Sequence, residues 1–171
     1  VYPLAIHGPK AEALMASIFG DKIKEIKFFN FKIFDFLGSK QLIARSGYSK
    51  QGGFEVYLNG FHLGSKLWDV IWDAGKKFNI TAGCPNLIER IEGGLLSYGN
   101  EFTIQNNPFE CNFDKFLSTD TDHTYIGKNS LEKIKNEGVK KRIKGILFDS
   151  VPCPPCAKPF PVLSKKGNKI G

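Results

Sequence analysis

One carboxylate in a short apolar run is the group in this chain best suited to bind a ligand. Glu55 stands between Phe54 and Val56, and Tyr57 follows two positions later. Because side chains alternate along a strand, Glu55 and Tyr57 would share one face of it. A carboxylate accepts two parallel hydrogen bonds with charge assistance, and a tyrosine ring can stack on the same ligand. A solvated surface glutamate is the alternative that the residues alone leave open.

A glycine-rich bend, residues 46–53, leads into this run and carries Gly47, Gly52 and Gly53. Glycine lets a backbone turn sharply and approach a ligand closely, so the bend is a candidate wall of a binding site. A long hairpin loop is the alternative. The Gly-x-Gly-x-x-Gly pattern of dinucleotide sites and the phosphate-loop pattern are both absent from the sequence.

A second stretch, residues 83–100, combines carboxylates with paired glycines. It ends in Ile-Glu-Gly-Gly and then, after two leucines, Ser-Tyr-Gly-Asn. A glutamate beside two glycines can cap or pair locally. We therefore expect Glu92, Tyr98 and Asn100 to organise the fold rather than to contact a substrate.

Both stretches resemble the tetrahydrofolate-binding half of the aminomethyltransferase (glycine-cleavage T-protein) family. Residues 46–55 are similar to the family's segment of Thr/Ser-Gly-Tyr, a short polar stretch and Gly-Phe-Glu, and residues 91–100 to its Leu-Glu-Ala-Gly and Leu-Tyr-Gly-Asn runs. The family's arginine falls on Asn86 here. With the polar pair at 50–51, this departure resembles the dimethylsulfoniopropionate demethylase branch of the family.

The resemblance implies a tetrahydrofolate-dependent methyltransferase. Its reaction would move a methyl group from a sulfonium such as dimethylsulfoniopropionate to N5 of tetrahydrofolate, the co-substrate. The matching glutamate of the family contacts the pterin, so this role is carried to Glu55, with Tyr57 beside it as a second folate-binding residue. The reaction implies no metal site.

Two other functions stay open. One is a glycine-cleavage aminomethyltransferase, which would need a lipoyl carrier protein as its partner. The other is a non-catalytic folate-binding relative.

The resemblance also implies an α+β fold in two parts. Residues 1–138 would form the later part of the folate-binding domain, and residues 139–171 the truncated start of a C-terminal β-barrel. We expect the chain to be an internal piece of a longer protein, with the catalytic residues upstream of Val1. The piece would then be inactive alone.

The apolar pattern predicts the elements that position the candidate site. Strands are expected at 4–6, 41–45, 54–58 and 79–82, and a buried, aromatic β-like segment at 23–33, with a hairpin turn at 37–40. Helices are expected from Pro9 to Gly20, from Leu63 to Lys76, and from a cap at Asn129 to Gly138. A further helix is expected to begin at Pro85 and to turn four apolar side chains inward, namely Leu87, Ile88, Ile91 and Leu95. Further short strands are expected at 143–148 and 160–163, followed by a turn and a return strand at 169–171. Trp68 and Trp72 are one helical turn apart and are expected in the core or an interface.

Composition narrows the partners and the compartment. The chain has 171 residues and a formal charge of +7, but only three arginines. The one dense basic cluster, residues 140–144, lacks interleaved aromatics, so nucleic acid is not the expected partner. No apolar run is long enough to span a bilayer, and no secretion signal precedes the first strand. We therefore expect a cytoplasmic protein that binds no membrane, and the sequence leaves a homodimer open.

The cysteines and histidines do not indicate a metal site. Cys153 and Cys156 have metal or redox spacing, but they lie in a proline-rich connection, and Cys84 and Cys111 are isolated. The three histidines are scattered along the chain. Reduced cysteines in a linker are the simplest interpretation.

Overall fold

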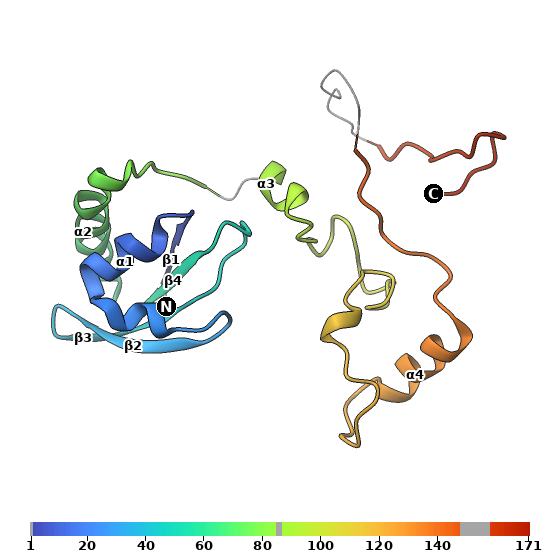
Figure 1. The fold of residues 1–171 in the computed structure, drawn as a ribbon, viewed down its shortest axis with the longest axis horizontal. Coiled ribbons are helices and arrows are strands. Elements are labelled where there is room, and N and C mark those ends of the chain that lie inside the picture. The colour runs from blue at the N-terminus through green and yellow to red at the C-terminus, as the bar shows by residue number, and fades with distance from the viewer. Residues whose placement is uncertain (1, 85–86, 148–157) are drawn as a thin grey trace.

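The computed structural model describes residues 2–84, 87–147 and 158–171 (Figure 1). Its strands and α-helices are β1 (Tyr2–His7), α1 (Ala11–Phe19), β2 (Phe31–Phe36), β3 (Ser39–Ala44), β4 (Gly53–Leu58), α2 (Gly64–Gly75), α3 (Leu87–Glu92) and α4 (Lys128–Glu137). Short 3₁₀ helices lie at η1 (Asp21–Glu25), η2 (Phe61–Leu63), η3 (Lys76–Phe78) and η4 (Asp114–Phe116). The mixture of helix and antiparallel sheet confirms the predicted α+β class.

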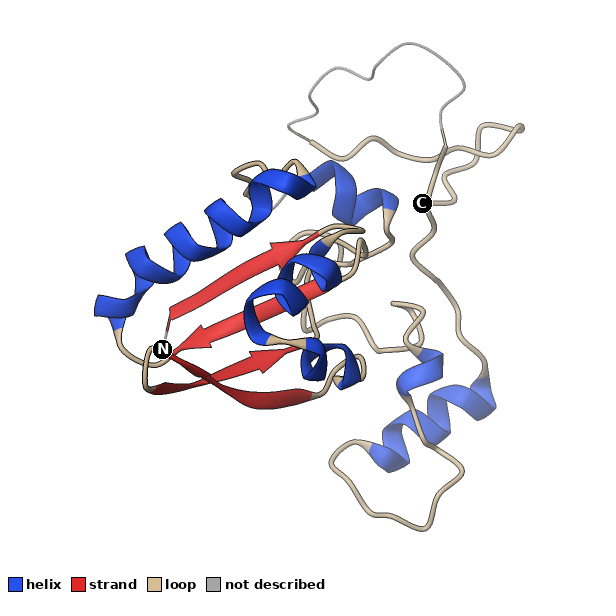
Figure 2. Cartoon of the chain, turned by 60° about the vertical axis from the view of Figure 1, so that its left-hand side comes forward, coloured by secondary structure: helices blue, strands red, loops and turns tan. Residues whose placement is uncertain are grey.

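A four-stranded antiparallel sheet in the order β1-β4-β3-β2 forms the centre of the N-terminal part (Figure 2). Val56 on β4 pairs with Leu4 on β1 and with Ile43 on β3, which fixes the register of the three strands. Leu37 and Gly38 join β2 to β3 with φ angles of 53° and 77°. Two left-handed residues in a two-residue turn match the twist of the flanking strands. The predicted hairpin is therefore confirmed.

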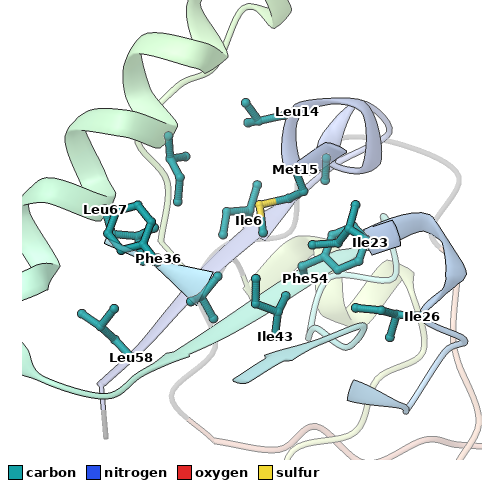
Figure 3. Packing of buried hydrophobic residues seen from close by; sticks show 13 residues of the cluster. Ile6, Leu14, Met15, Ile23, Ile26, Phe36, Ile43, Phe54, Leu58 and Leu67 are labelled. Atoms are coloured by element: carbon teal, nitrogen blue, oxygen red, sulfur yellow. The ribbon is translucent and has the colours of Figure 1, made fainter. Parts of the chain in front are cut away.

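Helices α1 and α2 pack on one face of the sheet and make the core with it (Figure 3). The innermost side chains include Met15 from α1, Leu67 from α2 and Phe54 from β4, none more than 1 % exposed. Gly20 ends α1 with φ 81°, as predicted, although the helix begins at Ala11 rather than at Pro9. The strand at 54–58 and the helix from Leu63 are confirmed to within a residue or two.

The aromatic segment at 23–33 differs from the prediction. Ile23 and Ile26 are buried, but they belong to η1 and the turn that follows it. Phe29 turns the chain with φ 59°, so β2 starts only at Phe31. The three phenylalanines of the segment and Ile33 are all more than half exposed. The alternation of β2 sends Phe31 and Ile33 to the sheet face away from α1 and α2, which the sequence pattern could not specify.

Two predictions between 79 and 95 are also wrong. Residues 79–82 form no strand, because Asn79 adopts the left-handed conformation and the chain continues without regular pairing. In α3, Leu87, Ile88 and Ile91 are each about 60 % exposed or more, and Arg90 is the buried residue. Pro85 lies outside the described residues.

The C-terminal part has little regular structure in the described ranges. Helix α4 ends at Gly138 as predicted, but Gly127 rather than Asn129 stands at its N-cap. Residues 143–147 form no strand, since Ile143 N–H bonds to the carbonyl of Glu110 instead of to a neighbouring strand. Leu163 and Lys169 form an isolated antiparallel bridge across the expected turn, but residues 160–163 and 169–171 do not extend it into the predicted strands. The barrel and the boundary at 138/139 stay predictions, and Phe148, Cys153 and Cys156 lie outside the described residues.

Candidate functional site

A cleft of about 1300 Å³ runs along the outer edge of β1. Its far wall is the extended segment 79–84, and its floor includes apolar side chains of α1 and α2. Glu55 lines the cleft near the glycine-rich bend, and Trp68 and Trp72 line it from α2. The two indoles stack with ring centroids 5.9 Å apart. Trp68 is 45 % exposed, so of the two predicted locations, core or interface, the core is excluded for this residue.

The position of Glu55 follows from the register of the sheet. Phe54 and Val56 are buried against the helices, so the side chain of Glu55 lies on the opposite face, as predicted. Its cross-strand neighbours are Ala5 on β1 and Ala44 on β3. Two alanine methyl groups cannot cover a carboxylate, which therefore stays half-buried and accessible from the cleft.

The carboxylate of Glu55 is held through one of its oxygens. Ser46 Oγ donates to Oε2 at 2.5 Å, and the Tyr57 hydroxyl donates to the same oxygen at 3.3 Å. Glu55 and Tyr57 thus share one face and touch, as the alternation predicted. Ser46 lies nine residues before Glu55, and this contact was not predicted from the sequence.

Tyr57 faces a second, smaller hollow of about 400 Å³, next to Leu42 and Ile33. The negative charge of Glu55, together with partial burial and the hydrogen bond, raises the pKa of Tyr57 above its ordinary value. The phenol is therefore protonated at neutral pH and available as a hydrogen-bond donor. Tyr57 therefore contacts Glu55 but does not line the large cleft.

His7 fills the space that two glycines of the bend leave free. A Cβ atom on Gly47 would lie 2.3 Å from Nε2 of His7, and one on Gly53 would lie 2.4 Å from the carbonyl oxygen of Ile6. The backbone approach requires glycine at position 53, and Gly47 leaves room for the His7 ring in its present position. His7 also lines the cleft, on the same sheet face as Glu55, a placement that no local pattern predicted.

The bend makes direct contact with the second glycine-containing stretch. The Tyr48 hydroxyl donates to the carbonyl of Leu96 at 2.6 Å, and Lys50 Nζ donates to the carbonyl of Gly93 at 2.7 Å. The two stretches that resemble the family therefore meet in space, although about forty residues separate them. Neither contact was predicted.

An ion pair between the buried Arg90 and the partly buried Glu101 organises the end of the second stretch. Arg90 Nη1 lies 2.9 Å from Glu101 Oε2 and 3.1 Å from the carbonyl oxygen of Leu95. Burial disfavours the Glu101 carboxylate, but hydrogen bonds from Ser97 N–H and Arg90 outweigh this and lower the pKa of Glu101. Arg90 Nε has no partner among the described residues. The guanidinium is thus committed to the fold of residues 90–101 and cannot reach the cleft.

Gly83, Cys84, Leu87 and Glu89 of the second stretch line the cleft, but its later residues do not. Asn100 Nδ2 donates to Ser97 Oγ, and the Tyr98 ring packs edge-on against Phe102. Glu92 is exposed at the end of α3. In the part of the chain that the structure describes, the cleft is lined by none of Glu92, Tyr98 and Asn100.

The basic cluster is engaged in local ion pairs. Arg142 binds Asp114 through two parallel hydrogen bonds of 2.8 Å. The hydrogen bonds to Asp114, and to a smaller extent its negative charge, raise the pKa of Arg142 above its ordinary value. Lys141 lies 4.0 Å from Glu110. These pairs reduce the positive charge that residues 140–144 present.

Over the ranges 2–84, 87–147 and 158–171, no three His, Cys, Asp or Glu side chains gather as metal ligands would. Within the same ranges, every helix is too short or too polar to cross a membrane.

Comparison with known proteins identifies the family of this chain. The GCVT N-terminal domain matches residues 1–121, which include Glu55, the bend and the second stretch. The chain belongs to the GCVT N-terminal domain family. The resemblance on which the sequence analysis relied is confirmed.

A demethylase and aminomethyltransferases are among the proteins to which the chain is similar. Dimethylsulfoniopropionate demethylase DmdA of Ruegeria pomeroyi is 44% identical over 171 residues, which is all of this chain and 46% of the demethylase. Aminomethyltransferases of Thermoanaerobacter sp. and Natranaerobius thermophilus are 37% and 34% identical over 149 and 172 residues. These alignments cover 85% and 98% of this chain, and 40% and 46% of the aminomethyltransferases. The chain thus spans less than half the length of these relatives.

Proposed function

We propose that the complete protein is a tetrahydrofolate-dependent methyltransferase that takes a methyl group from a sulfonium such as dimethylsulfoniopropionate. The main support is the 44% identity to a protein named for that demethylation, which extends over the whole chain. The aminomethyltransferases are less similar, at 34–37%.

The observation that carries the folate part of the proposal is the held carboxylate of Glu55. A pterin presents a ring N–H and an exocyclic amine side by side, and a carboxylate matches such a pair of donors. Glu55 is half-buried, flanked by alanines, and opens on a cleft that is large for a small-molecule site. The residues present therefore fit tetrahydrofolate.

The residues of this chain would bind and orient tetrahydrofolate rather than activate the methyl donor. N5 of tetrahydrofolate would form the new bond to the methyl carbon and release its proton to water, while the methyl donor's carbon–sulfur bond breaks with its electron pair left on sulfur, which becomes an uncharged thioether sulfur. Because a sulfonium is already an activated leaving group, alignment and exclusion of water are what the protein needs to provide. Glu55 would anchor the pterin, and the stacked Trp68 and Trp72 would provide an apolar wall. Residues at the reacting atoms are proposed to lie in the rest of the complete protein.

A glycine-cleavage aminomethyltransferase is the second candidate, because relatives with that name reach 37% identity. It would use the same carboxylate for folate and a lipoyl carrier protein for the donor. The two candidates differ in the donor and agree on the role of Glu55.

The test uses the complete protein with tetrahydrofolate and dimethylsulfoniopropionate, and detects 5-methyltetrahydrofolate by mass spectrometry. We expect product from the native protein and none above background from Glu55→Gln, whose amide cannot accept from both donors. Glu137→Gln, at the exposed end of α4, is the matched control and should keep full activity.

Saturable folate binding without product would reject the sulfonium donor and favour an aminomethyl donor. Absence of folate binding would reject both candidates.

A further inference from the structure

The two oxygens of the Glu55 carboxylate are in different situations. Oε2 accepts hydrogen bonds from Ser46 and from Tyr57, whereas Oε1 accepts none from the residues that the structure describes. Each carboxylate oxygen offers two lone pairs. Both acceptor positions of Oε2 are therefore taken, and those of Oε1 are free for a ligand.

The two donors on Oε2 differ in strength. The Ser46 hydrogen bond is 2.5 Å long, at the short end for a hydroxyl and a carboxylate, whereas the Tyr57 hydrogen bond of 3.3 Å is longer than usual. A ligand with two adjacent donors must displace one of the residents to reach both oxygens. The longer and weaker contact, from Tyr57, is the one that yields.

The backbone before Ser46 is fixed by several independent contacts. Arg45 N–H donates to the carbonyl of Asn30 at 2.9 Å, and its guanidinium lies 2.7 Å from Glu12 and 3.2 Å from the carbonyl oxygen of Ile26. The same guanidinium lies over the ring of Phe54. Ser46 therefore starts from a rigid position at the end of β3, as a residue that orients another side chain must.

From this geometry we infer that Ser46 is the positioning residue of the folate site. Its hydroxyl fixes the Glu55 carboxylate through Oε2 and keeps Oε1 free for the first donor of the ligand. It stays bound to Oε2 while the Tyr57 hydroxyl gives way to the second donor of the ligand. The inference rests on the proposed function. It also assigns different roles to two hydroxyl groups that touch the same oxygen.

The test measures the dissociation constant of tetrahydrofolate by calorimetry on the complete protein. Ser46→Ala should weaken binding about tenfold or more, which corresponds to the loss of one strong orienting hydrogen bond. Ser46→Thr keeps the hydroxyl and should restore binding to within about threefold of the native value. Tyr57→Phe keeps the ring and should also stay within about threefold. Ser17→Ala, on the exposed side of α1, is the control for loss of a serine hydroxyl.

Thermal unfolding of each variant shows whether Ser46→Ala acts through stability. We expect an unchanged midpoint together with weaker binding, which a purely structural role would not produce. If Glu55→Gln abolishes binding but Ser46→Ala leaves it within twofold, about the error of the measurement, the inference fails and the proposed function stands.

A loss in Ser46→Ala that Ser46→Thr does not restore would overturn the role of the hydroxyl. A loss in Tyr57→Phe as large as in Ser46→Ala would overturn the division between the two donors. If native protein binds no tetrahydrofolate, the proposed function itself fails.

Discussion

Lys50 Nζ donates a hydrogen bond to the carbonyl oxygen of Gly93 across 2.7 Å. The contact ties the glycine-rich bend, which carries the partner of Glu55, to the turn that ends α3. A Cβ atom at position 93 would lie 3.2 Å from Cβ of Lys50, so the two stretches are in close contact at this point. The two stretches that identify the family thus support each other physically.

Replacing Lys50 by Met should loosen the turn after α3 without unfolding the sheet. Gly93 N–H and Gly94 N–H donate within this turn, and Leu95 N–H donates to the carbonyl of Arg90. Because the lost contact is exposed, we expect about two- to fivefold faster hydrogen exchange at these amides and little change in global stability. Hydrogen exchange with mass or NMR detection measures both.

Lys27→Met provides the matched control for Lys50→Met, since the Lys27 side chain is exposed beside η1, far along the chain from α3. It should leave the exchange of Gly93, Gly94 and Leu95 unchanged. Equal acceleration in both variants would mean that the Lys50 contact does not hold the turn.

A buried amide anchors the end of β4. Gln41 is fully buried, and its Oε1 accepts from Asn59 N–H at 2.6 Å. Gln41→Leu keeps the volume but leaves the Asn59 N–H unpaired, so we expect the free energy of unfolding to fall by about 1–3 kcal/mol. Denaturant titration of the complete protein measures this. Gln105→Leu, a change on a loop, should cost little by comparison, and an equal loss would refute the anchor.

Local alternation was enough to predict the face that Glu55 occupies. Phe54 and Val56 could only point into the core, so the carboxylate had to point the other way. The partner of that carboxylate was not predictable, because the closeness of Ser46 depends on how the whole bend closes around His7 and the glycines. Single-strand patterns do not contain that information.

The apolar pattern also failed to predict which face of α3 is buried, because the local sequence does not show what covers the helix. Leu87, Ile88 and Ile91 have helical spacing, and they do lie in a helix, but Arg90 is the side chain that is buried. Its burial depends on Glu101 and on the carbonyl of Leu95, which come later in the chain. An ion pair across a turn can override a hydrophobic stripe in a helix of six residues.

The Arg90–Glu101 pair predicts a stability that depends on pH. The pKa of Glu101 is lowered in the folded state. The carboxylate therefore contributes its full stabilisation of the fold above the ordinary glutamate pKa of 4.5, and this stabilisation is lost as the pH falls through the lower pKa of the folded state. Glu101→Gln should destabilise the protein by about 2 kcal/mol at neutral pH, because it leaves a buried guanidinium without its counter-charge. In acid, where the native carboxylate is protonated, the difference should shrink.

Unfolding measured in native protein and Glu101→Gln across this pH range checks the coupling. Glu92→Gln, an exposed change in the same stretch, should show no comparable difference. A penalty for Glu101→Gln that stays constant into acid would contradict a role for the carboxylate charge.

The carboxylate of Glu55 and the phenol of Tyr57 are linked electrostatically. The carboxylate charge is the largest cause of the raised pKa of Tyr57, since it opposes a second negative charge on the phenol. Glu55→Gln should therefore lower the pKa of Tyr57 toward its ordinary value of 10.0. The ring signals of Tyr57, assigned by their loss in Tyr57→Phe, report this in an NMR titration. Glu137→Gln should leave them unchanged, and an unshifted titration in Glu55→Gln would mean that the two side chains are not neighbours on this face.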